Sequence, residues 1–141
     1  MLAIADRAVI DVTMPGRAIA NVLTRAFEGE RTHAWLMGCV LETQMPRRTP
    51  WYWDASLFDC ADFTLWLDVR LHPWRNLSEV RKFTRRIMLQ ALAEIRADHP
   101  RLWGVLRAAE HAQDNCDIDE KDADAIVQLL FLGAIVFEDT T

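Results

Sequence analysis

The sequence predicts an α+β fold that is dominated by helices and contains a small sheet of two to four strands. Apolar residues recur with a helical period in stretches that begin near Pro15, Asn76 and Asp119. In residues 63–71, by contrast, apolar and polar residues alternate, as they do in a half-buried strand. An all-α fold, in which residues 54–71 form a buried helix, is the alternative.

The length and composition fit a single globular domain that spans residues 1–141. Apolar residues make up 51% of the chain and charged residues 26%, which is typical of a protein that buries its own core. The longest uncharged apolar stretch, residues 125–137, is shorter than the roughly 20 residues that cross a bilayer. Charged residues at positions 6, 7 and 11 interrupt any apolar leader, so we expect a soluble, cytoplasmic protein.

The cysteines and basic residues indicate the cellular setting. Cys39, Cys60 and Cys116 include no closely spaced pair, which is typical of free thiols in a reducing compartment. Of the 16 basic residues only Lys82 and Lys121 are lysine. Together with the abundant alanine, this preference for arginine indicates a GC-rich genome, bacterial or phage.

The first predicted helix begins at Pro15, with Thr13 as its cap, and ends at Gly29. The preceding residues 8–13 are rich enough in β-branched side chains for a short strand. Residues 34–41 form a continuous apolar run. Periodicity alone does not separate a buried strand from a buried helix there.

The strand predicted for residues 63–71 closes at Pro73. The longest helix is predicted next, over residues 77–97, because Asn76 is a favourable N-cap and Glu79 completes a capping box. The expected buried stripe of this helix comprises Val80, Phe83, Ile87, Met88, Ala91 and Ile95.

Two further helices complete the prediction, one over residues 101–113 and one that begins near Asp119. The last helix is apolar almost all round its circumference, so it should lie at the centre of the core. Gly133 should end it. Residues 135–137 then form a short strand or a packed tail.

Charge is divided unevenly along the chain. Residues 114–141 hold eight acidic residues and one lysine, a net of −7. The whole chain has a net of −5, so residues 1–113 carry +2. The molecule is therefore expected to be an electrical dipole, provided that the acidic and basic segments do not fold onto each other.

On the predicted helix 77–97, basic residues fall within one arc that has Leu89 at its centre. They are Arg81, Lys82, Arg85, Arg86 and Arg96. Three interpretations follow: a solvated face or arginines paired with the acidic segment, a phosphate-binding stripe for nucleic acid, or a contact for a protein partner with an acidic surface.

An aromatic segment between two prolines is the second unusual feature. Trp51, Tyr52 and Trp53 are consecutive, so they cannot all point into one core from a helix or a strand. Arg47 and Arg48 precede them, and aromatic residues beside arginines are typical of binding hot spots. The alternative is a loop that folds its tryptophans over the edge of the core. The exposed patch would extend to Trp74 if that residue lies nearby.

No motif predicts a metal site, a cofactor site or a catalytic residue. The acidic run 114–124 departs from a calcium-binding loop at three of the important positions. The four histidines are scattered, and neither a nucleophile elbow nor a phosphate-binding glycine loop is present. We therefore expect a protein that is not an enzyme and needs no cofactor.

The pattern favours a non-enzymatic module that binds another protein, such as an inhibitor, an immunity or anti-defence protein, or an assembly chaperone. The expected anchors are Arg47, Arg48, Trp51, Tyr52, Trp53, Trp74, Arg81, Arg85, Arg86 and Leu89. The alternative is a nucleic-acid-associated protein that uses the basic face of helix 77–97. Self-association is a further expectation, because opposite charges on one chain can pair between copies.

Overall fold

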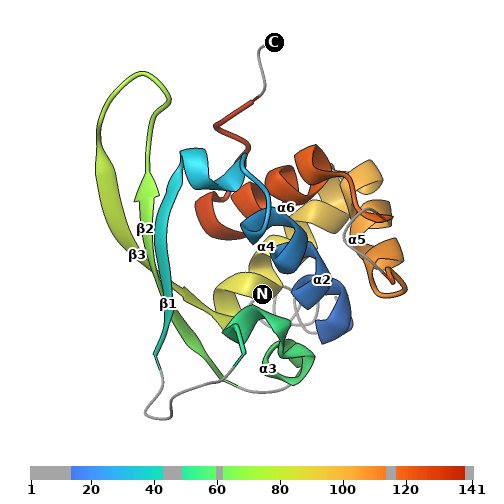
Figure 1. Cartoon of the computed structure of the whole chain (residues 1–141). Helices are drawn as coiled ribbons and strands as arrows, with labels where there is room; N and C mark the ends of the chain where they lie inside the picture. Colours follow the sequence, from blue (N-terminus) through green and yellow to red (C-terminus); the bar gives the residue numbers. More distant parts are fainter. Residues whose placement is uncertain (1–13, 43–48, 60–61, 114–116, 139–141) are drawn as a thin grey trace, which may run out of the picture.

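The computed structural model describes residues 14–42, 49–59, 62–113 and 117–138. The chain folds into helices packed against a three-stranded antiparallel sheet, which confirms the predicted helix-dominated α+β class (Figure 1). The described elements are α2 (Gly16–Phe27), η1 (Thr32–Ala34), β1 (Leu36–Leu41), η2 (Trp51–Trp53), α3 (Ala55–Asp59), β2 (Thr64–Arg70), β3 (Ser78–Thr84), α4 (Arg85–Asp98), α5 (Pro100–Ala109) and α6 (Glu120–Leu132). None of the described helices has the length and hydrophobicity that a bilayer crossing requires.

The sheet has the strand order β1-β2-β3, and the described helices all lie on one side of it (Figure 1). The strand predicted for residues 63–71 is confirmed as β2. Leu65, Leu67 and Val69 are buried against the helices, while the alternate residues face outward. This alternation leaves the outer face of the sheet uncovered by any described element.

Residues 34–41, whose sequence fits either structure, form strand β1 from Leu36 onward. A bulge at Met37 shifts the register of β1 against β2. Helix α2 confirms the first predicted helix, with Pro15 as its N-cap. The expected cap Thr13 and the strand considered for residues 8–13 lie outside the described residues.

The prediction of one long helix over residues 77–97 is wrong in its first half. Residues Ser78–Thr84 form strand β3, and helix α4 begins only at Arg85. Thr84 replaces Asn76 as the N-cap, and its hydroxyl accepts a hydrogen bond from the Ile87 amide at 3.4 Å. Antiparallel pairing with β2 overrides the local capping signal, because it satisfies the backbone and places Phe83 opposite Leu65 in the core.

The expected buried stripe changes with this correction. Val80 is 66% exposed and Ile87 is 38% exposed, so neither belongs to the core. Phe83, Met88, Ala91 and Ile95 are buried as predicted, although Phe83 reaches the core from a strand. A strand and a helix can both place Phe83 on an apolar face, so its burial alone does not separate the strand period from the helical period in residues 78–84.

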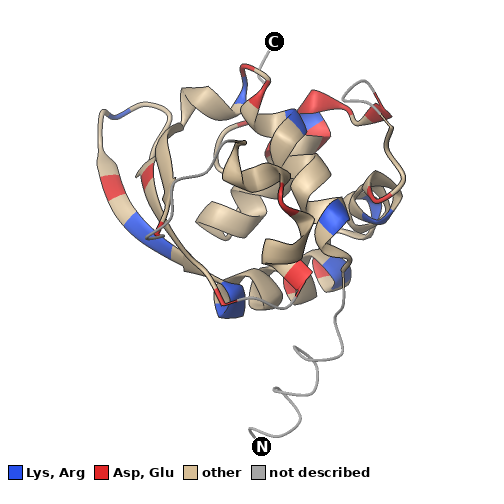
Figure 2. Cartoon of the chain, turned by 60° about the horizontal axis from the view of Figure 1, so that its bottom comes forward, with Lys and Arg blue, Asp and Glu red and all other residues tan. Residues whose placement is uncertain are grey.

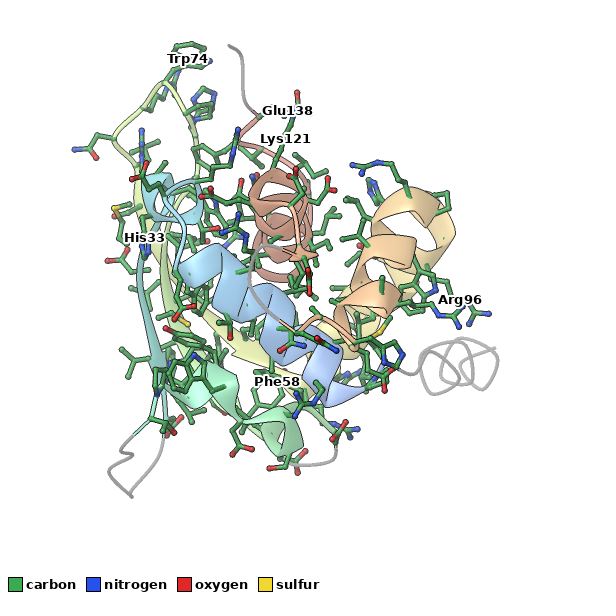
Figure 3. All side chains as sticks on the ribbon, turned by 45° about the vertical axis from the view of Figure 1, so that its right-hand side comes forward. His33, Phe58, Trp74, Arg96, Lys121 and Glu138 are labelled. Carbon is green, nitrogen blue, oxygen red and sulfur yellow. The ribbon has the colours of Figure 1, made fainter. Side chains whose placement is uncertain are left out.

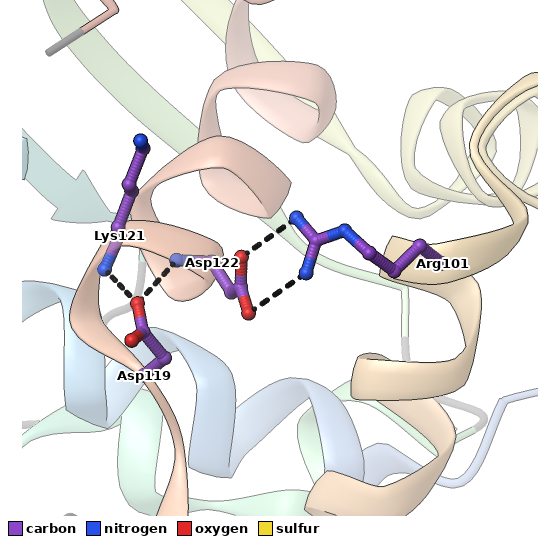
Figure 4. Close-up of polar contacts among 4 residues, drawn as sticks. All are labelled: Arg101, Asp119, Lys121 and Asp122. Carbon is purple, nitrogen blue, oxygen red and sulfur yellow. Dashed lines mark hydrogen bonds and ion pairs between the residues drawn. The ribbon is translucent and has the colours of Figure 1, made fainter.

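Helix α6 is the central helix of the core, as predicted. Eight of its residues are buried, and it packs against α2, α4 and α5. The Asp119 carboxylate caps its first turn by accepting hydrogen bonds from the amides of Lys121 and Asp122 (Figure 4). Gly133 ends it in the left-handed conformation, with φ 79°.

The chain after α6 is a packed tail rather than a strand. The Phe137 ring stacks against Trp35, with 6.3 Å between their centroids. The Gln128 carboxamide oxygen accepts hydrogen bonds from the amides of Val136 and Phe137 at 2.9 and 2.8 Å. Its nitrogen donates to the Phe137 carbonyl at 2.7 Å. A single buried side chain thus holds the tail on the core.

A buried carboxylate joins α6 to the start of the sheet. Asp124 is only 6% exposed. Its oxygens accept hydrogen bonds from the Trp35 indole and the Thr32 hydroxyl, both at 2.8 Å, and from Gln128 at 2.9 Å. These three donors are neutral, and their hydrogen bonds help to offset the cost of removing the carboxylate from water.

Replacing Asp124 with alanine should destabilise the fold by about 3 kcal/mol, because it leaves the Trp35 indole and the Thr32 hydroxyl buried without an acceptor. Urea denaturation followed by circular dichroism measures the effect. Asp122→Ala is the matched control on the same helix. It removes an ion pair with Arg101, which is exposed to solvent (Figure 4), and should cost less than about 1 kcal/mol. Equal losses for the two variants would contradict the role assigned to Asp124.

Glu120 gives the fold a predictable dependence on pH. Its carboxylate accepts hydrogen bonds from the amides of Arg31 at 3.0 Å and Glu30 at 2.6 Å, and these contacts lower its pKa. Gly29 permits this approach, since a Cβ there would lie 2.3 Å from a carboxylate oxygen of Glu120. The charged form is thus favoured in the folded state, so its stabilisation is present above the unfolded-state pKa and is lost as pH falls through the lower folded-state pKa.

We therefore expect Glu120→Gln to lower the free energy of unfolding by about 1 kcal/mol at neutral pH. The difference from the wild type should shrink as the pH falls below the usual glutamate pKa of about 4.3. Urea denaturation at neutral and acidic pH tests this. Glu30→Gln, at an exposed glutamate, is the control and should change stability little at either pH. A difference for Glu120→Gln that persists in acid would refute the assignment.

Candidate protein-binding surface

Apolar side chains gather on the outer face of the sheet. The register places Val40 opposite Trp66, and Trp66 opposite Lys82. In the neighbouring row Val80 lies opposite Asp68. Val40, Trp66 and Val80 are 63%, 43% and 66% exposed. These three residues form what we call the sheet-face patch, with Lys82 and Asp68 as its charged neighbours.

Trp66 at the centre of this patch is held in place by polar contacts. Its indole nitrogen donates a hydrogen bond to the Glu42 carboxylate at 3.2 Å. The Lys82 ammonium lies 5.6 Å from the centroid of its ring, within cation–π range. A tryptophan that is exposed and already ordered loses little conformational entropy when a partner covers it.

The β2–β3 hairpin extends this surface beyond the helices (Figure 1). Trp74 is 83% exposed at the tip of the hairpin (Figure 3). Leu77, which directly precedes β3, is 51% exposed. The tip is fixed by short-range hydrogen bonds. The Trp74 amide donates to the His72 ring at 3.0 Å, and the Leu71 amide donates to the Leu77 carbonyl at 3.0 Å.

The aromatic segment predicted as the main anchor is divided between core and surface. Trp51 and Tyr52 are half-buried and pack edge-on against Phe27, at 5.8 and 4.9 Å between ring centroids. Burial, and secondarily the Glu28 carboxylate, raise the pKa of Tyr52. Trp53 is 50% exposed. Only this third ring is therefore largely available to a partner.

The other expected members of that patch do not join it. Arg47 and Arg48 lie outside the described residues. Trp74 follows the far end of β2, whereas the aromatic segment and α3 precede its near end. In Figure 3 the Trp74 label accordingly stands at the opposite end of the molecule from Phe58 of α3. Trp74 thus belongs with the hairpin rather than with Trp53.

The basic arc predicted on helix 77–97 does not exist as one helix face. Arg81 and Lys82 lie on β3, and Arg81 forms an ion pair with Glu79. Arg85 opens α4 and donates a hydrogen bond to the Asp59 carbonyl at 2.8 Å. Arg86, which follows it in the helix, is exposed. Leu89 is half-buried against the core. Figure 2 shows the basic positions distributed over the sheet and the helices.

The acidic and basic segments also contact each other, so the charge division along the chain is not a simple dipole in space. Arg101 of α5 forms two hydrogen bonds with Asp122 of α6, at 2.9 and 3.1 Å (Figure 4). The Arg25 side chain donates to the Ile118 carbonyl at 2.7 Å. Positive charge is shared between α4–α5, where residues 85–107 hold five basic and two acidic residues, a net of +3, and the hairpin. Residues 64–84 hold four basic and two acidic residues, a net of +2.

Sequence reasoning missed Val40, Trp66 and Val80 as surface candidates. Trp66 carried a usable signal, because its place among Thr64, Asp68 and Arg70 in the alternating stretch puts it on the polar face of a strand. Val80 carries no such signal, because the helical period of residues 77–97 places it on the predicted buried stripe. The patch becomes visible only when three strands are placed side by side.

The remaining hollows of the described surface show no clustered chemistry. One of them, an open depression of about 830 Å³, is lined partly by Trp103, Arg107 and His111. The described residues contain no group of three or more His, Cys, Asp or Glu side chains placed to hold a metal ion. Burial raises the pKa of the Cys39 thiol to about 12, so it remains protonated at neutral pH.

The aromatic segment gives a direct prediction about stability. Trp51→Ala should cost about 2 kcal/mol, because the ring packs against Phe27 and Phe58. Trp53→Ala should cost less than about 1 kcal/mol, since half of its surface is already in water. Urea denaturation of both variants makes the comparison. Equal losses would show that Trp53 belongs to the core as much as Trp51 does.

Comparisons with protein-family models, with curated proteins and with solved structures find no match for this chain. Its residues and their geometry are therefore the basis for any assignment of function. Among the described surfaces, the sheet-face patch with its hairpin combines exposed apolar side chains, an ordered tryptophan and an excess of positive charge.

Proposed function

We propose that this protein is a non-enzymatic binding module that docks onto another protein through the outer face of its sheet. The observation that carries the proposal is the uncovered face itself. Val40, Trp66 and Val80 are exposed on the outer face of the sheet. The described helices pack only against its inner face, so the core does not require apolar side chains on the outer one. Apolar side chains that the fold does not need at the surface are typical of interaction sites.

The arrangement also resembles the anatomy of a protein interface. A tryptophan occupies the centre of the patch, and tryptophan is among the residues enriched in hot spots. Charged groups from Glu42, Asp68 and Lys82 surround it, which matches an apolar centre with a polar rim.

Charge favours a partner with an acidic surface around an apolar patch. The hairpin of residues 64–84 carries +2, whereas the chain as a whole carries −5, so the rest of the chain carries −7. An acidic partner would be attracted to the hairpin and repelled from the acidic segment of residues 114–141, which carries −7. Such complementarity orients the encounter and raises the association rate, and its effect weakens as salt is added.

A nucleic-acid function loses its main support once β3 replaces the start of the predicted helix. The basic residues no longer form a stripe along one helix, and Arg81 and Arg85 have partners within the chain. Inhibitors, immunity or anti-defence proteins and assembly chaperones all remain within the proposed class, because each acts by binding a protein.

The test compares two tryptophans of similar exposure. A partner captured from the native host by the wild-type protein is purified, and its affinity is measured by calorimetry for wild type, Trp66→Ala, Val40→Lys and Trp53→Ala. Trp66→Ala should weaken binding about 30-fold or more, as removal of a hot-spot residue does. Val40→Lys should act likewise, whereas Trp53→Ala should leave the affinity within about threefold of wild type.

Circular dichroism and urea denaturation confirm that each variant is folded. A captured partner whose affinity is unchanged by both Trp66→Ala and Val40→Lys would overturn the proposal. Loss of binding only with Trp53→Ala would move the site to the aromatic segment and would equally overturn it. Binding to duplex DNA that competes with the partner and falls steeply with salt would instead favour the nucleic-acid function.

A further inference from the structure

We infer that the open edge of β3 pairs with β3 of a second copy of this chain, on a two-fold axis at Val80. The inference concerns the backbone edge of the sheet and shares only Val80 with the sheet-face patch. The strand order β1-β2-β3 makes β3 an edge strand, and no element of the described chain pairs with its outer side.

The direction of the β3 backbone groups follows from its pairing with β2. The Leu71 amide donates to the Leu77 carbonyl, so these two residues form a hydrogen-bonded pair of the antiparallel ladder. Every second residue behaves in the same way, and Glu79 and Arg81 therefore turn their backbone groups toward β2. Ser78, Val80 and Lys82 turn theirs to the open edge.

This edge is long and free of proline, and its charged side chains, which normally discourage strand addition, are Glu79, Arg81 and Lys82. β3 is seven residues long. Val80 in its middle is 66% exposed. Lys82 is the one lysine within the strand. A long, regular edge with free amides and carbonyls is a template for another strand.

Space for the second strand lies next to the edge. A groove of about 430 Å³ runs between β3 and the helices α4 and α6, and Ile87, Glu94 and Leu129 contribute to its walls. An added strand directs alternate side chains toward this groove. Glu94 on its wall has the charge that complements an incoming arginine.

Symmetry restricts the register. Two identical strands that pair antiparallel across one edge are related by a two-fold axis perpendicular to the sheet, which keeps outer faces on the same side. The axis must therefore pass between a residue and its own copy. An axis at Glu79, Arg81 or Lys82 would set two like charges directly opposite each other, which is unfavourable.

An axis at Val80 avoids every such conflict. Val80 then lies opposite the second Val80, and Ser78 lies opposite Lys82 of the other copy. Glu79 lies opposite Arg81 of the other copy, twice, so the ion pair within each strand becomes part of an alternating ring of four charges. Ser78, Val80 and Lys82 direct their backbone groups to the open edge. In the dimer, these residues of the two strands would exchange on the order of six backbone hydrogen bonds.

The resulting dimer has one continuous antiparallel sheet. On its outer face, the two sheet-face patches meet at the paired Val80 side chains. The sequence of β3 is complementary to itself when the axis lies at Val80, and it is not when the axis lies at Glu79, Arg81 or Lys82. This self-complementarity favours a second copy of the chain over an unrelated strand.

Sedimentation equilibrium from about 1 to about 200 µM tests the inference, a range in which a weak dimer shows mass action. The wild type should pass from monomer to dimer. Val80→Pro should remain monomeric, because proline removes the central outward amide, which the monomer does not use. Val80→Ala keeps that amide, so it should still dimerise, and its dissociation constant should lie within about tenfold of the wild-type value.

A charge exchange tests the register. Glu79→Arg and Arg81→Glu should each raise the dissociation constant of the dimer about tenfold or more, because each sets like charges opposite one another. The double variant Glu79→Arg/Arg81→Glu should restore it to within about threefold of wild type. Circular dichroism verifies that all variants are folded.

A wild type that stays monomeric over the whole range would overturn the inference. A dimer that survives Val80→Pro, or one that the double charge exchange fails to restore, would overturn it equally. The Glu79 and Arg81 variants leave Val40, Trp66 and Val80 unchanged, so failure of the charge exchange is distinguishable from failure of the proposed protein-binding function.

Discussion

The hydrogen bonds to the buried Asp124 carboxylate are the constraint on which the arrangement of helices and sheet depends. A carboxylate that is 6% exposed needs donors, and Trp35 and Thr32 provide them immediately before β1. The same contacts fix where β1 begins relative to α6. Gln128, one turn further along the helix, joins the network and holds the tail against Trp35. One helix therefore positions both the first strand and the end of the described chain.

The sheet that is positioned in this way has helices on one face only. Its inner residues meet α6 and α4 in a core where Phe83 and Phe131 lie 4.8 Å apart between ring centroids. The residues on the outer face do not pack in this core, yet Val40, Trp66 and Val80 among them are apolar. A domain of this size can bury a sufficient core from one face of a sheet, so the composition of the other face is free to serve binding.

Face and edge are two properties of the same hairpin. Residues 64–84 supply the exposed tryptophan, the unpaired edge and a local charge of +2 within a chain of −5. In the helical body, by contrast, some charged groups make contacts within the chain, such as Arg101 with Asp122 and Glu120 with the turn after α2. The same strands also supply core residues, because Leu65, Leu67, Val69 and Phe83 face the helices. In the hairpin, alternate side chains therefore divide between stability and contact.

The sequence by itself determined the helices from Pro15 and Asp119, the strand over residues 63–71 and the end of α6 at Gly133, because periodicity, capping and glycine chemistry are local. Only the tertiary structure decided that residues 78–84 form a strand. Pairing with β2 outweighed a capping signal at Asn76, and no local rule weighs one against the other. The same step turned a predicted basic helix face into an edge strand. It also moved the candidate site from Trp51 and Tyr52, which pack on Phe27, to Val40, Trp66 and Val80 on three different strands. Residues that distant in sequence become one surface only through strand pairing, and for that reason the helical body was predictable while its contact surface was not.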